Sequence, residues 1–308
     1  MPIAQRSRRG FLRGLVALVA GLTLAPPARA AGPAAITKPI PASGERLPVI
    51  GMGSWLTFDV GDNAAERAQR VQVVQTFFEQ GGALIDSSPM YGSSEEVIGY
   101  CLGRIAAKER LFAATKVWTP GRWLGVQQME SSRRKWGLSR FDLMQIHNLL
   151  DWEAHLDTLK AMKAEGRLRY IGITTSHGRR HDEFARVMAR EPLDFVQFTY
   201  NLDDRAAEQR LLPLAAERGM AVIVNRPFDG GGLFRRVRGQ PLPPWAAEID
   251  CANWAQFLLK FVVSHPAVTC AIPATSRVEH MRENMGAGFG RLPDAALRTR
   301  MVQYLESL

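Results

Sequence analysis

Four side chains able to donate or accept protons lie at the ends of apolar, strand-like segments of this 308-residue chain. Asp86, Lys116 and His147 each end such a segment, and Tyr91 lies in the loop that follows Asp86. If the strands are parallel neighbours, all four side chains converge on one rim. A carboxylate, an ammonium, a phenol and an imidazole in one place predict a proton-transfer site rather than a packing pattern.

These four groups have complementary chemistry. A tyrosine phenol has a pKa of about 10, and we expect the Lys116 ammonium to lower the pKa of Tyr91. Asp86 supplies the counter-charge for that lysine, and His147 can donate a hydrogen bond to a substrate oxygen. The set would hand a proton to a carbonyl oxygen while another group attacks the carbon. Because no side chain delivers hydride, this chemistry indicates a nicotinamide cofactor.

The order of the elements predicts the scaffold that positions these residues. The expected strands are 49–55, 83–87, 111–117, 141–147, 170–174, 194–200, 220–226 and 268–273. The expected helices are 63–80, 95–105, 124–136, 152–164, 182–190, 205–218, 253–264 and 278–285, with a last helix at 293–308. Eight strands alternating with eight helices predict an α/β protein, a (β/α)8 TIM barrel with one extra C-terminal helix. Residues 36–50, with a Ser43-Gly44 turn, predict an N-terminal β-hairpin.

Local signals mark several element boundaries. Ser93-x-x-Glu96 predicts a capping box that opens the second helix. Helix-ending glycines are expected at Gly81, Gly166 and Gly219. The longest irregular segment is expected at 228–250, which contains three consecutive glycines. A loop of that length in a compact barrel usually serves function.

Five segments together carry a family resemblance. They are Ile85-Asp86-Ser87-Ser88 with Tyr91-Gly92, Ala114-Thr115-Lys116, Gln145-Ile146-His147, the run 166–172, and Ala271-Ile272-Pro273 followed by Glu283-Asn284. From about Ile36 to its C-terminus the chain resembles an aldo-keto reductase. The resemblance implies that Tyr91 donates the proton, that Lys116 and Asp86 tune it, and that His147 orients a small-molecule carbonyl substrate. It also implies NADPH, or less often NADH, across the barrel mouth.

The resemblance assigns further residues to the cofactor and the substrate. The implied cofactor contacts are Gly53, Ser54, Trp55 and Asp86 at the nicotinamide and its ribose, Thr174, Thr175 and Gln197 at the carboxamide, Gly231, Gly232 and Leu233 at the pyrophosphate, and Thr275, Arg277, Glu283 and Asn284 at the adenosine end. Arg226, where the family differs, could stack on the nicotinamide or pair with a phosphate. Trp55, Trp118 and Trp123 follow strand ends, where they could line a substrate pocket or cover the barrel rim.

Three positions depart from the family pattern. Thr174-Thr175 stands where Ser-Asn is usual, and Asn225-Arg226 stands where an aromatic often stacks on the nicotinamide. Ala274 replaces a lysine that commonly meets the 2′-phosphate, and Arg277 could take over that contact, which favours NADP over NAD. The altered nicotinamide contacts leave open a second hypothesis, a nucleotide-binding sensor or interaction protein on the same barrel.

The first 30 residues read as a targeting segment. Paired arginines in 7–13 precede an apolar stretch at 14–25, and Ala28-Arg29-Ala30 offers a cleavage site. This order resembles a twin-arginine signal, which implies export of the folded protein through a translocon to the periplasm. An ordinary amphipathic helix and an uncleaved membrane anchor are the alternatives. We therefore expect a signal peptide at 1–30 and one barrel domain at 31–308.

Composition narrows the remaining function classes. The net charge of +9 includes five arginines of residues 1–30, which contain no acid, so the rest of the chain carries +4. The basic residues form no cluster with interleaved aromatics, so no nucleic-acid partner is expected. Cys101, Cys251 and Cys270 lack metal-site spacing, and the pair His177 and His181 fits a solvated loop better than a metal site. We therefore expect no metal ion. If the protein is exported, a redox partner could regenerate its cofactor.

Overall fold

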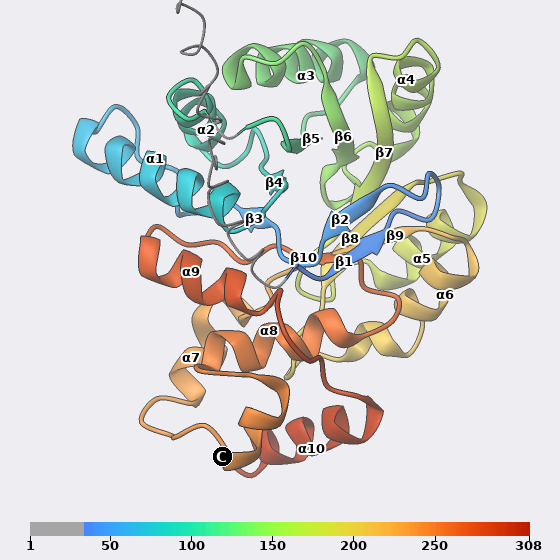
Figure 1. Cartoon of the computed structure of the whole chain (residues 1–308). Helices are drawn as coiled ribbons and strands as arrows, with labels where there is room; N and C mark the ends of the chain where they lie inside the picture. The colour runs from blue at the N-terminus through green and yellow to red at the C-terminus, as the bar shows by residue number, and fades with distance from the viewer. Residues whose placement is uncertain (1–33, 107) are drawn as a thin grey trace, which may run out of the picture. The chain divides into compact units, whose positions relative to one another are not determined.

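The computed structural model describes residues 34–106 and 108–308, so the expected signal segment lies outside the described residues. Within them, eight parallel strands form one sheet in chain order (Figure 1). The strands are β3 (Met52–Gly53), β4 (Leu84–Asp86), β5 (Phe112–Val117), β6 (Phe141–Ile146), β7 (Leu168–Thr174), β8 (Phe195–Thr199), β9 (Ala221–Asn225) and β10 (Cys270–Ala271). Single bridges Ile50–Ala271 and Gly53–Ala274 join the first strand to the last. The sheet thereby closes, which confirms the predicted (β/α)8 barrel.

Helices cover the outside of this sheet (Figure 1). They are α1 (Ala64–Glu79), α2 (Ser94–Leu102), α3 (Arg122–Trp136), α4 (Trp152–Ala164), α5 (His181–Arg190), α6 (Leu211–Glu217), α7 (Gly232–Arg236), α8 (Trp254–Ser264), α9 (Val278–Gly286) and α10 (Ala295–Glu306). The main core lies between the strands and these helices, where buried aliphatic and aromatic side chains from both layers pack together. None of these helices is long and apolar enough to cross a membrane.

An antiparallel hairpin closes the N-terminal end of the barrel. Its strands are β1 (Thr37–Pro39) and β2 (Arg46–Pro48), as the sequence predicts. Side chains of the hairpin and its turn pack with residues at the starts of the barrel strands in a second apolar cluster, which includes Leu47 and Phe112. The Tyr170 hydroxyl donates to the Glu45 carboxylate at 2.8 Å and lies 2.7 Å from the Ser43 hydroxyl. The barrel is therefore plugged at this end, and its chemistry is confined to the other.

Close backbone approach explains one glycine at the closure. A Cβ placed on Gly53 would lie 2.8 Å from the carbonyl oxygen of Ile272, closer than side chains tolerate. The backbone N–H of Gly53 also donates to Pro273 at 3.0 Å. Glycine at this position lets the first and last strands meet.

Two local predictions are corrected. Helix α2 does begin after Ser93, but the Ser93 hydroxyl makes no cap: it donates to Asp59 at 2.9 Å and accepts from the N–H of Gly61 at 2.8 Å. The predicted capping box is therefore wrong, because a neighbouring loop competes successfully for the hydroxyl. The segment 228–250 is less irregular than expected, since it contains α7 and the short turns η3 (Asp229–Gly231) and η4 (Pro244–Ile249).

Candidate active site

The C-terminal ends of β4, β5 and β6 bring the predicted proton-transfer residues together. Lys116 is fully buried, and its Nζ lies 2.5 Å from Asp86 Oδ2 and donates to the Ser87 carbonyl at 2.9 Å. Its Nζ also lies 5.4 Å from the centre of the Tyr91 ring. The Tyr91 and His147 rings meet edge to face at 5.7 Å. The prediction that these four residues converge on one rim is confirmed.

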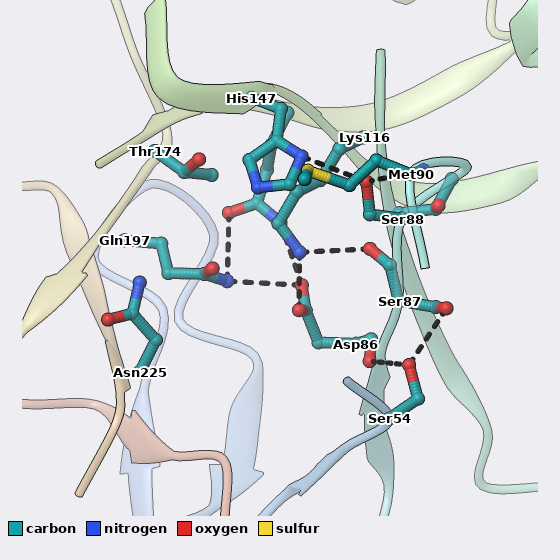
Figure 2. A network of polar contacts seen from close by, with 12 residues as sticks. Ser54, Asp86, Ser87, Ser88, Met90, Lys116, His147, Thr174, Gln197 and Asn225 are labelled. Atoms are coloured by element: carbon teal, nitrogen blue, oxygen red, sulfur yellow. Dashed lines mark hydrogen bonds and ion pairs between the residues drawn. The ribbon is translucent and has the colours of Figure 1, made fainter. Parts of the chain in front are cut away.

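Every oxygen of the Asp86 carboxylate is engaged (Figure 2). One oxygen pairs with Lys116, and the other accepts from Gln145 Nε2 and Gln197 Nε2, each at 3.0 Å. Gln145 lies beside Lys116 in the register of β5 and β6, so its side chain enters the same interior. In the sequence, Gln145 belongs to the Gln145-Ile146-His147 motif, and no role is predicted for it there. Its amide helps to fix the direction of the carboxylate.

Burial sets the proton affinities at the site. Burial disfavours the charged form of Lys116, but Asp86 beside it outweighs this cost, so the pKa of Lys116 lies above its usual value. Burial also raises the pKa of Tyr91, although the Lys116 charge acts in the opposite direction. The expected net lowering of the Tyr91 pKa is therefore wrong. The phenol carries its proton at neutral pH and is ready to donate it.

The imidazole of His147 is neutral at the same pH. Burial, and next the charge of Lys116, hold its pKa well below the usual value of 6.5. The ring lies directly after β6, where Ser88 Oγ is 2.9 Å from its Nδ1. A neutral imidazole retains one N–H for a substrate oxygen.

The loop that follows His147 has a strained backbone, and side chains of neighbouring loops and strands hydrogen-bond to it. Asn148, Leu149 and Asp151 all adopt positive φ angles, of 53°, 55° and 49°, which cost free energy for residues other than glycine. The Arg180 guanidinium donates to the carbonyls of Asn148 and Leu149, both at 3.0 Å. Thr174 Oγ1 accepts from the N–H of Asn148 at 3.1 Å. Neighbouring loops thus stabilise a backbone that would otherwise relax.

A model of the aldo/keto reductase family matches residues 49–299. The chain belongs to this family. Methylglyoxal reductase YeaE of Escherichia coli is 28% identical over 245 residues, which cover 77% of this chain and 84% of the relative. An aldo/keto reductase from Klebsiella pneumoniae, solved with NADP and acetate, superposes with a TM-score of 0.70 at 25% identity, over 85% of this chain and 93% of the other. A thermostable aldo-keto reductase, solved with the inhibitor epalrestat, gives 0.71 at 25% identity, over 88% and 99%.

This family membership makes the chain a nicotinamide-dependent carbonyl oxidoreductase. In this aldo-keto reductase, the residues predicted for the nicotinamide side surround Asp86. Ser54 Oγ lies 3.0 Å from the Asp86 carbonyl oxygen, and Gln197 donates to the Asp86 side chain. Thr174 and Thr175 are buried at the end of β7, but Thr175 Oγ1 donates to the Arg179 carbonyl at 2.6 Å. Its hydroxyl hydrogen is therefore already used within the protein.

Asn225 also belongs to this region, although the sequence marked it only as a departure from the family pattern. Its amide nitrogen donates to the Thr175 carbonyl at 2.9 Å, and its amide oxygen accepts from Thr199 Oγ1 at 2.8 Å. Figure 2 shows it beside Gln197. Asn225 ties together the ends of β7, β8 and β9 where the family often places an aromatic ring.

The residues predicted for the pyrophosphate lie after β9. Arg226 pairs with Asp229 at 2.8 Å, and Gly231, with a φ of 91°, directly precedes α7. Leu233 is buried, and Gly232 begins the helix. Contact between a phosphate and Arg226 would have to compete with the Asp229 carboxylate.

The residues predicted for the adenosine end lie after β10 and on α9. Thr275 and Asn284 are buried, Glu283 is half-buried, and Arg277 is exposed with its Nε 3.9 Å from Glu279. Asn284 lies on α9, and its side-chain amide is not among the enclosed polar atoms that lack a partner in the described part of the chain. The individual cofactor contacts stay predictions.

Exposed apolar side chains gather in the loops at this end of the barrel. Trp55, Trp118 and Trp123 are 42%, 40% and 71% exposed, so they are too open to serve as packed covers. Leu56 next to Trp55, Met90 in the loop after β4, and Leu124 next to Trp123 in the first turn of α3 are also exposed. No group of metal-ligand side chains is found among residues 34–106 and 108–308.

Proposed function

We propose that this enzyme reduces aldehyde and ketone carbonyls with NADPH, with Tyr91 as the proton donor. The observation that carries the proposal is the arrangement of Tyr91 between Lys116 and His147, with Lys116 paired to Asp86. Bound NADPH supplies the hydride. His147 orients the carbonyl oxygen, and Tyr91 donates its proton to that oxygen as negative charge develops. The Lys116 ammonium then stabilises the phenolate that is left.

The cofactor assignment rests on residues of this chain and on one relative. The Klebsiella pneumoniae structure contains NADP, and Thr275, Arg277 and Asn284 lie after β10 or on α9, where the adenosine end is predicted. Exposed Arg277, which holds Glu279 only loosely, would contact the 2′-phosphate. These features favour NADP over NAD.

The substrate would enter past the exposed tryptophans. Trp55, Trp118 and Trp123 are exposed after β3 and β5 and offer flat apolar surfaces to a substrate. We therefore expect carbonyl compounds with an apolar or aromatic portion to be reduced best. The name of the Escherichia coli relative points instead to a small, polar dicarbonyl, methylglyoxal.

Steady-state oxidation of NADPH, followed with a panel of aldehydes, ketones and quinones that includes methylglyoxal, tests the function. Turnover of at least one carbonyl, faster with NADPH than with NADH, is expected. Binding of NADPH without turnover of any member would favour the sensor hypothesis.

The place of action is also part of the proposal. The twin-arginine pattern at 1–30 supports export to the periplasm in the folded state. Cofactor made in the cytoplasm would then be loaded before export and re-reduced in place by a second substrate or a redox partner.

A further inference from the structure

The Ser88 hydroxyl lies between His147 and the backbone of Met90 (Figure 2). Its Oγ is 2.9 Å from His147 Nδ1 and 3.3 Å from the N–H of Met90. Ser88 is completely buried, so water does not complete its hydrogen bonding. Within the described part of the chain, these are the two polar partners of the hydroxyl.

The two partners impose a direction on the hydroxyl hydrogen. The N–H of Met90 can only donate, so it occupies a lone pair of Ser88 Oγ. If Nδ1 of His147 also carried hydrogen, it too would donate to Oγ, and the buried Ser88 O–H would have no acceptor. An unsatisfied buried donor is costly. Ser88 therefore donates, and Nδ1 of His147 accepts.

We propose that Ser88 is a positioning residue that fixes His147 in the tautomer with its hydrogen on Nε2. A neutral imidazole carries one hydrogen, so acceptance at Nδ1 places that hydrogen on the far side of the ring from Ser88. There it can be donated to the carbonyl oxygen of the substrate. The inference rests on the proposed role of His147 in orienting the substrate.

The tautomer itself can be read without any assay. In wild-type enzyme labelled with ¹⁵N-histidine, the His147 resonances are identified by their absence in His147→Gln. At pH 7 we expect the Nε2–H pattern, with a bare Nδ1. An Nδ1–H pattern or an imidazolium would overturn the proposal.

The contribution of Ser88 is tested with Ser88→Ala and a matched control. Ser132→Ala also removes a fully buried hydroxyl, one that donates to Glu95 at 2.7 Å outside the site. We expect Ser88→Ala to lose the single Nε2–H pattern and to lower kcat about 10- to 100-fold, the scale of one lost hydrogen bond, while the Kd for NADPH stays unchanged. Ser132→Ala should keep both the pattern and kcat.

Two outcomes separate this proposal from the proposed function. If Ser88→Ala retains a pure Nε2–H imidazole and wild-type kcat, Ser88 does not fix the tautomer. If the wild-type enzyme reduces no carbonyl, the function fails, yet the ¹⁵N pattern still decides the tautomer.

Discussion

The Tyr91 phenol is the single acid on which the proposed reaction depends. Tyr91→Phe should lower kcat for carbonyl reduction by about 10²- to 10⁴-fold, the usual contribution of a general acid, and leave NADPH binding nearly unchanged. Because burial raises the pKa of Tyr91, wild-type activity should persist through alkaline pH until the phenol loses its proton. Steady-state kinetics against pH measure both effects. A variant that keeps more than about a third of wild-type kcat would identify a different acid.

Cofactor choice depends on a second residue, Arg277. Its guanidinium is exposed, and its nearest approach to the Glu279 carboxylate is a long 3.9 Å. This weak pairing leaves the guanidinium available to contact a 2′-phosphate. Arg277→Ala should weaken NADPH binding by about 1.5–3 kcal/mol, the scale of a charge-assisted hydrogen bond, and change NADH binding little. Fluorescence titration with each cofactor measures this. Arg282→Ala, which removes an exposed arginine on α9, the helix that follows Arg277, is the control. Equal losses for NADPH and NADH in Arg277→Ala would refute the assignment.

At the scale of elements, the loop after β6 depends on the loop before α5. Asn148 and Leu149, directly after His147, have positive φ angles, and Arg180 donates hydrogen bonds to the carbonyls of both residues. Arg180→Ala should let this backbone relax and displace the imidazole, lowering kcat about three- to thirty-fold with little change in NADPH binding. Arg186→Ala, which removes an exposed arginine on α5, should leave kcat unchanged. Wild-type kcat in Arg180→Ala would show that the loop holds its shape without this contact.

The alternation of apolar strands and amphipathic helices was sufficient to predict the barrel and the rim on which Asp86, Lys116 and His147 meet. That pattern can be recognised in the sequence because it depends on the spacing of apolar residues within each short segment. What it missed depends on contacts between distant residues. The Ser93 hydroxyl donates to Asp59 instead of capping its own helix. Burial raises the pKa of Tyr91 by more than the charge of Lys116 lowers it.

The roles of Ser88 and Gln145 were missed for a related reason. Both lie inside motifs that the sequence analysis quoted, but their function follows from which atom each side chain reaches. Gln145 reaches Asp86 only because β6 aligns it with Lys116, and Ser88 reaches His147 across the gap between two strand ends. Neither contact can be predicted from the spacing of residues in the sequence.

At the scale of the whole molecule, the proposed export places a demand on cofactor binding. NADPH is made in the cytoplasm, so an exported enzyme needs a nucleotide that dissociates slowly, and residence is set mainly by the off-rate. Protein isolated from the periplasm, desalted and denatured should release close to one nucleotide per chain, identified by mass spectrometry. A folded periplasmic protein that is empty and binds NADPH only at micromolar strength or weaker would contradict this. Cytoplasmic protein prepared in parallel serves as the reference.

The closure of the barrel would give a bound nucleotide a mechanical role. Strands β3 and β10 are two residues long each, and the bridges Ile50–Ala271 and Gly53–Ala274 close the sheet beside them, so the pairing along this seam is short. The predicted contacts at Ser54 and Thr275 lie on opposite sides of the seam. A nucleotide that contacts both sides of the seam would bind only the folded barrel. It would therefore raise the melting temperature of the protein by mass action. It should also slow amide exchange at Gly51 and Gly53 more than at β6, where the strands pair at length.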